Sequence, residues 1–399
     1  MARQRSTNEN LPGNAGRRTK CQLTQSIDQK DETTMTMRFV MIGGFLGAGK
    51  TTTIGRLAKL YQSQGLKVGI VTNDQASDLV DTHTLRNQGF EVGEVAGACF
   101  CCHFNELTAT TSKLSAEHYP DVIIAEPVGS CTDLVATVIQ PLKHLHQDQF
   151  EVAPYGVILK PSHGLRILKG EANSGFSPKA AYIFEKQLEE ADFLILNRID
   201  ELTSEQIEEL ELLLTDKHPE IPIVKISAKT GEGMQQLLKQ MEKSGEYGNR
   251  ILELDYDIYA EGEAELGWLN SSLKVTAISA FELDALLLDI IERMRIRLAE
   301  LNGETAHLKT IGIGDAAHAV ANLISSDTPA QISLASSREL TQADIIVNAR
   351  VAIAPEILTD LVHDCVNSSV AAIKGTVEFG EMQSFRPGRP VPTHRYQAS

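Results

Sequence analysis

The chain has 399 residues, of which 42% are hydrophobic and 23% are charged, and its formal net charge at pH 7 is −16. This size and composition are typical of a globular protein of about two domains. The acidic excess argues against nonspecific binding to nucleic acid or acidic membranes, because both need a basic surface. No apolar run approaches the roughly 20 residues of a membrane helix, and no apolar signal-peptide core follows the start. We therefore predict a cytoplasmic protein with reduced thiols and no nucleic-acid or membrane partner.

The sequence divides into five parts. Residues 1–36 are polar and lack periodicity, so we predict a disordered arm. Residues 37–250 alternate apolar strand-like runs with helical patterns and predict an α/β domain with a mainly parallel sheet. Three further segments follow, over residues 251–269, 270–366 and 367–399, and they are taken up below.

The α/β part begins with a phosphate-binding loop. An apolar run over residues 39–42 predicts a buried strand, the sequence GGFLGAGKTT follows, and a helical pattern continues to Tyr61. This is the GxxxxGK[ST] motif in the strand–loop–helix context that it requires. Backbone N–H groups of such a loop surround the β-phosphate, Lys50 reaches the β- and γ-phosphates, and the Thr51 hydroxyl binds Mg²⁺. The residues predicted to bind the phosphates are Gly44, Gly47, Ala48, Gly49, Lys50, Thr51 and Thr52.

Two strand ends are predicted to sense the γ-phosphate. The first carries Thr72-Asn73-Asp74, where Asp74 is predicted to hold Mg²⁺, with capping of the next helix as the alternative. The second carries Glu126-Pro127-Val128-Gly129, where Glu126 is predicted to orient magnesium-bound water and the Gly129 N–H to meet the γ-phosphate. Lys50, Thr51 and Glu126 are thus the predicted catalytic residues.

Between these strand ends, Cys99, Cys101 and Cys102 lie within four positions. Thiolates are soft ligands that suit Zn²⁺, Co²⁺ or Cu⁺, and three of them leave one tetrahedral position open. His103 is a candidate for that position, although we favour a solvated histidine. Redox chemistry of the adjacent thiols is an alternative. The other cysteines are isolated in the sequence, which is typical of small buried apolar residues: Cys21, Cys131 and Cys365.

Two later motifs predict recognition of guanine. The strand-like run over residues 193–196 ends in Asn197-Arg198-Ile199-Asp200, which matches NKxD except for the arginine. The Asp200 carboxylate can accept hydrogen bonds from N1–H and N2–H of guanine, and Arg198 can lie flat along the base. A further strand ends in Ser227-Ala228-Lys229, whose backbone would contact the guanine oxygen. Together the motifs favour GTP over ATP, and they disfavour a P-loop kinase, which needs neither.

The second half of the chain contains no comparable set of reactive residues. Residues 251–269 are acidic, and we predict a linker with a solvated face, with a docking strip for a basic partner or a metal-transit surface as alternatives. Residues 270–366 predict a small α+β domain, with a ferredoxin-like fold as a candidate, that binds a client or a second copy of the chain. Residues 367–399 end in a basic, proline-rich stretch and predict an extended tail.

The order of GGFLGAGKTT, Cys-x-Cys-Cys, Glu-x-x-Gly and NRID resembles the CobW-type metallochaperone GTPases, a family related to the UreG and HypB nickel-insertion GTPases. The resemblance covers about residues 37–241. It implies GTP hydrolysis, binding of Zn²⁺ or Co²⁺ at Cys99, Cys101 and Cys102, and delivery of the metal to a client protein. No glutamine or arginine that positions the attacking water can be identified, so turnover is expected to be slow and stimulated by a metal or a partner.

Two other functions fit the same motifs. One is a GTPase that gates cofactor loading of a corrinoid or metal-dependent client enzyme, with thiols that sense the metal. The other is a non-catalytic protein that buffers metal. The thiol loop lies between the two predicted γ-phosphate sensors, so we further expect GTP and GDP forms to differ in metal affinity.

Overall fold

The computed structural model describes residues 36–74, 80–97, 99–170, 177–323, 326 and 328–398. The predicted N-terminal arm therefore lies outside the described residues, apart from Thr36. Among the described residues, no helix combines the length and the apolar character needed to cross a membrane.

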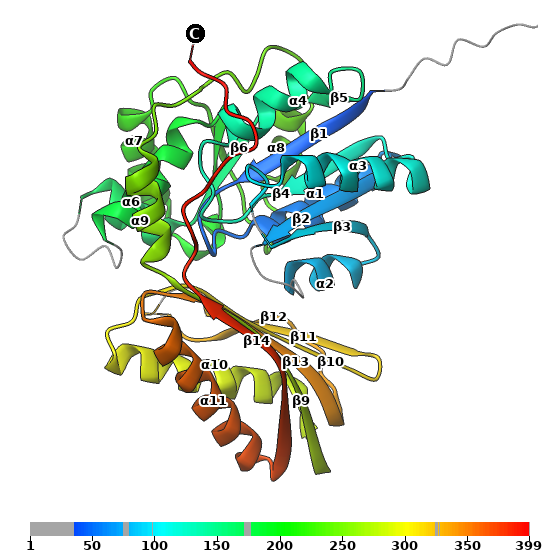
Figure 1. Cartoon of the computed structure of the whole chain (residues 1–399), viewed down its shortest axis with the longest axis vertical. Helices are drawn as coiled ribbons and strands as arrows, with labels where there is room; N and C mark the ends of the chain where they lie inside the picture. Colours follow the sequence, from blue (N-terminus) through cyan, green and yellow to red (C-terminus); the bar gives the residue numbers. More distant parts are fainter. Residues whose placement is uncertain are drawn as a thin grey trace, which may run out of the picture. The chain divides into compact units, whose positions relative to one another are not determined.

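The first part of the chain folds around an eight-stranded sheet (Figure 1). Its strand order is β3-β2-β4-β1-β6-β7-β8, with β5 also paired to β1, and the strand pairs among its described residues are parallel. The strands are β1 (Met37–Gly43), β2 (Val68–Asp74), β3 (Glu91–Ala96), β4 (Val122–Glu126), β5 (Phe150–Val152), β6 (Gly156–Leu159), β7 (Phe193–Leu196) and β8 (Ile223–Lys225).

Both faces of this sheet are buried, because successive side chains of a strand point to opposite faces. In β1, Phe39 and Met41 belong to one apolar core, whereas Val40 and Ile42 belong to the other. The helices of this part are α1 (Lys50–Ser63), α2 (Val80–Arg86), α3 (Phe104–His118), α4 (Gln140–Leu145), α5 (Pro161–Leu168), α6 (Pro178–Glu189), α7 (Ser204–Lys217), α8 (Met234–Met241) and α9 (Tyr256–Ala264), with short helical turns at Val135–Ile139 and Ile199–Glu201.

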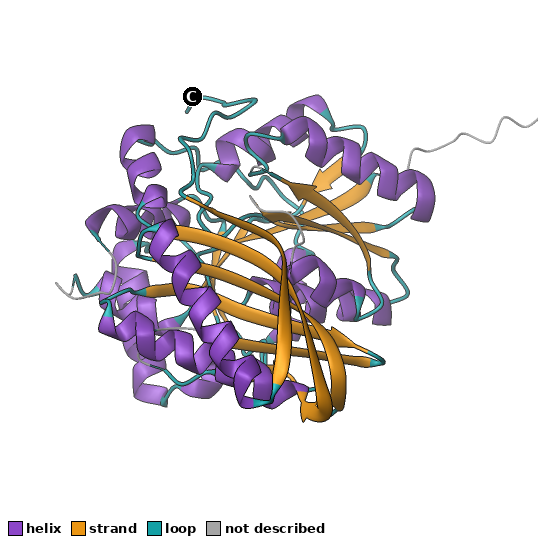
Figure 2. Cartoon of the chain, turned by 60° about the horizontal axis from the view of Figure 1, so that its bottom comes forward, coloured by secondary structure: helices purple, strands orange, loops and turns teal. Residues whose placement is uncertain are grey.

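The second part is a six-stranded antiparallel sheet of order β12-β11-β10-β13-β9-β14. Figure 2 shows its two helices packed on one face of the sheet. Four strands and both helices follow the β-α-β-β-α-β order of a ferredoxin-like fold, and β11 and β12 are an addition at one edge. The elements are β9 (Gly267–Glu282), α10 (Leu283–Glu300), β10 (Thr305–Gly314), β11 (Ala317–Leu323), β12 (Gln331–Leu334), β13 (Glu339–Val351), α11 (Pro355–Ala372) and β14 (Gly375–Phe385).

The predicted fold class, a P-loop α/β domain followed by a smaller α+β domain, is confirmed. The predicted tail is wrong over its first half, because α11 continues to Ala372 and β14 pairs with β9. Val377 and Phe379 alternate with polar residues and pack against the core of the second sheet. The predicted linker is wrong as well, because α9 lies within it and β9 begins at Gly267.

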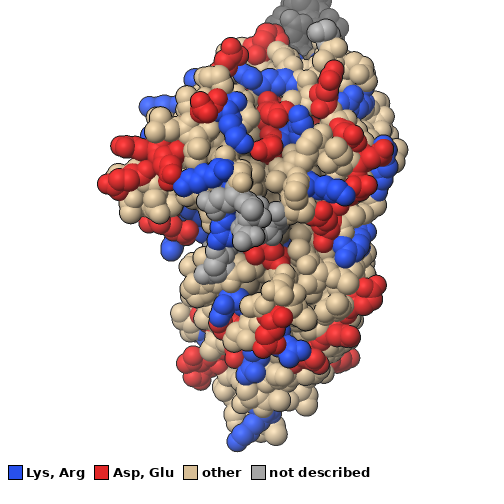
Figure 3. All heavy atoms as spheres, turned by 90° about the vertical axis from the view of Figure 1, so that its left-hand side faces the viewer, with Lys and Arg blue, Asp and Glu red and all other residues tan. Residues whose placement is uncertain are grey.

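Charges of both signs are mixed on the surface. Figure 3 shows Lys and Arg interspersed with Asp and Glu over the face that it displays. The net charge of −16 is therefore not gathered into a single patch on that face.

Candidate functional site

The phosphate loop joins β1 to α1 and depends on its glycines. Gly44, Gly47 and Gly49 have φ values of 132°, 70° and 98°. Residues other than glycine rarely adopt positive φ values of this kind. A Cβ atom on Gly49 would also clash with the amide of Asn197. Helix α1 then begins at Lys50, so its N-terminus faces the loop and favours an anion there.

The predicted catalytic side chains lie together at this loop. The Lys50 ammonium donates hydrogen bonds to the carbonyl oxygens of Gly44 (2.8 Å) and Phe45 (3.3 Å). The Thr51 hydroxyl donates to the Glu126 carboxylate at 2.9 Å, and both residues are buried. A Cβ atom on Gly129 would lie 2.9 Å from the Lys50 nitrogen, so the turn after β4 packs directly on the loop.

The predicted guanine-binding motifs meet the same loop through Asn197. Its amide nitrogen donates to the Ala48 carbonyl at 2.8 Å, and its amide oxygen accepts from the Ala228 N–H at 3.0 Å. Arg198 has a φ of 64° and donates to Glu201 at 2.9 Å. Asn197 therefore fixes the distance between the phosphate loop and the guanine-binding motifs.

Arg56 is a residue of this region that sequence reasoning missed. It projects from α1 and donates to the carbonyl oxygens of Ala228 and Lys229. Its place two turns into the helix that follows the phosphate loop is the only signal in the sequence.

A cavity of about 560 Å³ connects these residues. The predicted residues that line it are Gly47, Gly49, Lys50, Thr51, Thr52, Glu126, Gly129, Asn197, Arg198, Ala228 and Lys229. Gly44, Ala48, Asp200 and Ser227 are not among the lining residues. The side chain of Asp74 lies outside the described residues, so its predicted role stays a prediction.

The three clustered cysteines converge as the sequence predicts. Their sulfur atoms all lie within 4.8 Å of one another. The Cys99 sulfur is 2.9 Å from that of Cys101 and 3.4 Å from that of Cys102, and the last two are 3.8 Å apart. The N–H groups of Cys102 and His103 both donate to the Cys99 carbonyl, which folds the loop into the tight turn that gathers the thiols.

The three thiols differ in pKa. Hydrogen bonds from Cys101 and Cys102 lower the pKa of Cys99 well below its usual range. The same interactions, with burial, raise the pKa of Cys101. The hydrogen bond with Cys101 acts to lower the pKa of Cys102, but its bond to Cys99 and its burial raise that pKa to about 11. Cys99 is therefore the thiol that carries negative charge most readily, and thiolates are the form that binds metal.

The thiol loop is attached to the cavity through Asn73 of β2, which is one of the cavity's lining residues. The Asn73 amide oxygen accepts from the Phe100 N–H at 2.8 Å, and its amide nitrogen donates to the Val95 carbonyl at 2.9 Å. A displacement of β2 at the cavity would therefore move the backbone between Cys99 and Cys101.

Two buried groups that the sequence did not single out lie beside the thiols. Cys131, expected to be a simple apolar core residue, interacts with the thiols of Cys99 and Cys101. Glu263 of α9, expected on a solvated face, is 1% exposed, accepts a hydrogen bond from Ser130, and has its pKa raised to about 8 mainly by burial. For Cys131 a signal existed, because it follows the turn after β4, and the ends of parallel strands meet at one edge of a sheet.

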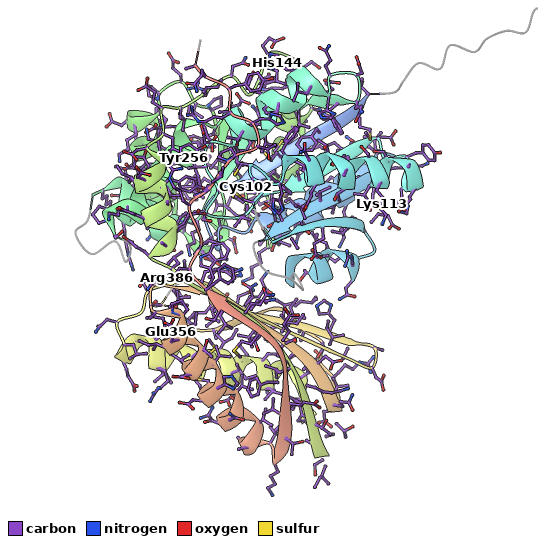
Figure 4. The ribbon with its side chains drawn as sticks, in the orientation of Figure 1. Cys102, Lys113, His144, Tyr256, Glu356 and Arg386 are labelled. Atoms are coloured by element: carbon purple, nitrogen blue, oxygen red, sulfur yellow. The ribbon has the colours of Figure 1, made fainter. Side chains whose placement is uncertain are left out.

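The C-terminal segment, residues 386–398, covers the thiol loop instead of extending away. The Thr393 N–H donates to the Cys101 carbonyl at 2.8 Å, the Thr393 hydroxyl donates to the Cys102 carbonyl at 2.8 Å, and the Val391 N–H lies 3.3 Å from the Cys102 sulfur. Figure 4 labels Cys102 and Tyr256, and both lie beside this segment.

Ion pairs hold the segment down. Arg395 contacts the buried Asp133 at 2.7 Å, and Arg389 contacts Asp257 of α9 at 2.9 Å. The basic tail is thus a partner of the acidic strip within the same chain.

Residues 38–225 match the sequence model of the CobW/HypB/UreG nucleotide-binding domain. This part of the chain belongs to the CobW/HypB/UreG family. The resemblance predicted from the motifs is confirmed, and the CobW-type domain contains both the phosphate loop and the three clustered cysteines.

Two curated relatives each match about half of this chain. The zinc chaperone CobW of Sinorhizobium sp. is 28% identical over 218 residues, which are 48% of this chain and 59% of the relative. The zinc-regulated GTPase metalloprotein activator 1 of Dictyostelium discoideum is 22% identical over 213 residues, or 46% and 44% of the two chains. The chain thus spans about half the length of these relatives. Among solved structures, Zn(II)-bound YjiA GTPase from E. coli is 12% identical with a TM-score of 0.36, over 85% of this chain and 99% of YjiA.

Proposed function

We propose that the protein is a GTP-hydrolysing metallochaperone that binds a thiophilic divalent metal, Zn²⁺ or Co²⁺, at Cys99, Cys101 and Cys102 and delivers it to a client protein. The observation that carries the proposal is the attachment of the thiol loop to the cavity through Asn73, whose oxygen accepts from the Phe100 N–H. The names of the curated relatives, a zinc chaperone and a zinc-regulated GTPase, support the same chemistry.

Binding of GTP would depend on the residues of the phosphate loop. Lys50, now bonded to loop carbonyls, would turn to the β- and γ-phosphates, and the guanine would lie near Asn197 and Arg198. Thr51 and Glu126 offer oxygen donors 2.9 Å apart at a buried position, which fits Mg²⁺ because it prefers oxygen ligands. Bound there, Mg²⁺ would neutralise charge that develops on the phosphates.

Binding of the delivered metal would depend on the thiols. Soft thiolates bind Zn²⁺ or Co²⁺ in preference to Mg²⁺. The thiol site and the magnesium site would therefore each bind its own ion, because their ligands differ in chemistry. Each thiol that binds loses its proton to solvent, and the low pKa of Cys99 makes it the first to do so. Because Asn73 lines the cavity and also accepts from the Phe100 N–H, loss of the γ-phosphate would shift the thiol loop and lower its metal affinity.

The test is to titrate Co²⁺ into the reduced full-length protein and to follow the thiolate-to-cobalt charge-transfer band, while GTP hydrolysis is measured on the same sample. We expect a thiolate band and slow hydrolysis that metal accelerates. Cys101→Ser should weaken the band, and Cys365→Ser, at a buried thiol of the second domain, should leave it unchanged. Absence of a thiolate band in the wild type would contradict the proposal. A band without any GTP hydrolysis would favour a metal buffer.

A further inference from the structure

Three thiols leave one position of a tetrahedral site to be filled, and the structure offers a candidate other than His103. The His103 ring pairs with Glu106 at 3.1 Å, and its side chain is 37% exposed. Cys131, by contrast, is 1% exposed and belongs to the same apolar core as Cys99 and Cys101. Its thiol interacts with those of Cys99 and Cys101, although its sulfur atom lies outside the set of three that are all within 4.8 Å of one another.

The backbone around Cys131 is held firmly in place. Its N–H donates to the Val128 carbonyl at 3.0 Å, and its carbonyl accepts from the Gln187 side chain at 2.7 Å. The same Gln187 nitrogen donates to the Gly129 carbonyl at 3.0 Å. Cys131 is therefore presented to the other thiols by a fixed turn rather than by a free loop.

A second observation points to a ligand at this place. One carboxylate oxygen of Glu263 accepts from Ser130, the neighbour of Cys131, but the other oxygen is buried and has no hydrogen-bond partner among the described residues. Burial of a polar atom without a partner is costly. The Glu263 carboxyl is anchored on Ser130, next to Cys131 in the chain, and it interacts electrostatically with both Cys99 and Cys131.

We propose that Cys131 is the fourth thiol ligand of the metal site, together with Cys99, Cys101 and Cys102. The inference rests on the proposed function, because it concerns the same metal. Four thiolates form a closed tetrahedral site of the kind that suits Zn²⁺ or Co²⁺. On binding, each thiol that still carries a proton releases it to solvent, four metal–sulfur bonds form, and no oxidant or reductant takes part.

The position of Cys131 gives this ligand a mechanistic consequence. Cys131 lies two residues after Gly129. Gly129 belongs to the turn that packs on Lys50 at the phosphate loop. If loss of the γ-phosphate breaks the bonds from Gln187 that hold this turn, the turn would shift and withdraw one of the four ligands. The site would then open to three ligands, which is the form able to pass the metal to a client.

The direct test is X-ray absorption of the zinc-loaded full-length protein, which counts sulfur neighbours at about 2.3 Å. The chain has six cysteines, so the double variant Cys21→Ser/Cys365→Ser leaves only the four proposed ligands. We expect four sulfur neighbours in the wild type and in this double variant. Cys131→Ser should show three sulfur neighbours and one lighter atom. Its zinc affinity should fall at least about 100-fold, because mutation of a residue that only supports a metal ligand already costs up to about 100-fold, and loss of a ligand should cost no less.

The outcomes separate the two proposals. Three sulfur neighbours and one lighter atom in both the wild type and the double variant would overturn the role of Cys131 and leave the three-thiol site standing. Absence of sulfur neighbours in the wild type would defeat the proposed function itself. If Cys131→Ser does not fold, the sulfur count of the double variant still decides, because that protein retains Cys131.

Discussion

The nucleotide site and the thiol cluster are built in different ways. The phosphate loop is one continuous stretch, from Gly44 to Thr51, whose function depends on backbone geometry and on the start of a helix. The thiol cluster draws on segments that are distant in the sequence: the loop at Cys99, the turn at Cys131, helix α9 and the C-terminal segment. The phosphate loop can bind its ligand in an open cavity. The thiol cluster can instead be covered or exposed by movement of the separate segments that surround it.

The largest expected effect is on GTP hydrolysis at the nucleotide site. Lys50→Ala should lower the rate of GTP hydrolysis about 1,000-fold, because the ammonium can no longer stabilise charge on the phosphates. The cobalt–thiolate band should persist in this variant. Lys67→Ala, at an exposed lysine before β2, is the matched control. Hydrolysis at the wild-type rate in Lys50→Ala would show that the loop is not the catalytic site.

The next effect tests the burial that distinguishes the thiol cluster. The folded pKa of Glu263 is raised to about 8 from an ordinary value of 4.5, so ionisation of this group destabilises the folded state. Its contribution to stability is fully present below pH 4.5 and is lost as the pH rises to about 8, at about 1.4 kcal/mol per pH unit. Glu263→Gln should therefore be more stable than the metal-free wild type at pH 8, by on the order of 3 kcal/mol.

Urea unfolding of the reduced, metal-free protein across this pH range measures the effect. Glu253→Gln changes an exposed carboxylate of the same acidic strip and should follow the wild type. Parallel curves for the wild type and Glu263→Gln would contradict the raised pKa.

A smaller effect is expected at Asp200, which belongs to the predicted guanine-binding motif but is not among the residues that line the cavity. Asp200→Asn should weaken GTP binding about 30-fold, because the amide has one acceptor oxygen where the carboxylate has two. Xanthosine triphosphate, which carries an oxygen at the position of the guanine amino group, should recover part of the lost affinity. Competition against a fluorescent GTP analogue gives the affinities, with Glu208→Gln as the exposed control. Unchanged GTP affinity would argue against base recognition by Asp200.

The smallest effect concerns the C-terminal segment that covers the thiols. Arg395→Ala should lower the free energy of unfolding by about 1 kcal/mol, because Asp133 is buried and loses a charged partner. Alkylation of Cys102 should also become faster as the segment loosens. Arg389→Ala removes an exposed ion pair and should change neither quantity much. Equal alkylation rates in both variants and the wild type would show that the segment does not shield the thiol.

The contrast between the two sites also explains what the sequence could predict. The phosphate loop, the guanine motifs and the Cys99–Cys102 cluster are short local patterns whose spacing determines their chemistry. Cys131 is buried in the core as predicted, but its interaction with the thiols was not predicted. Glu263 was misjudged as a solvated acid because the residues that bury it come from other segments of the chain. Strand β14 was missed because its pairing with β9 joins residues about a hundred positions apart.

The central claim is that the nucleotide controls metal affinity, and the direct measurement is zinc affinity by competition with a chelator, once with a non-hydrolysable GTP analogue and Mg²⁺ and once with GDP and Mg²⁺. The account predicts tighter zinc binding with the GTP analogue, by at least about tenfold. By reciprocity, zinc should then tighten binding of the GTP analogue relative to GDP by the same factor. Equal zinc affinity in the two nucleotide states would contradict the account.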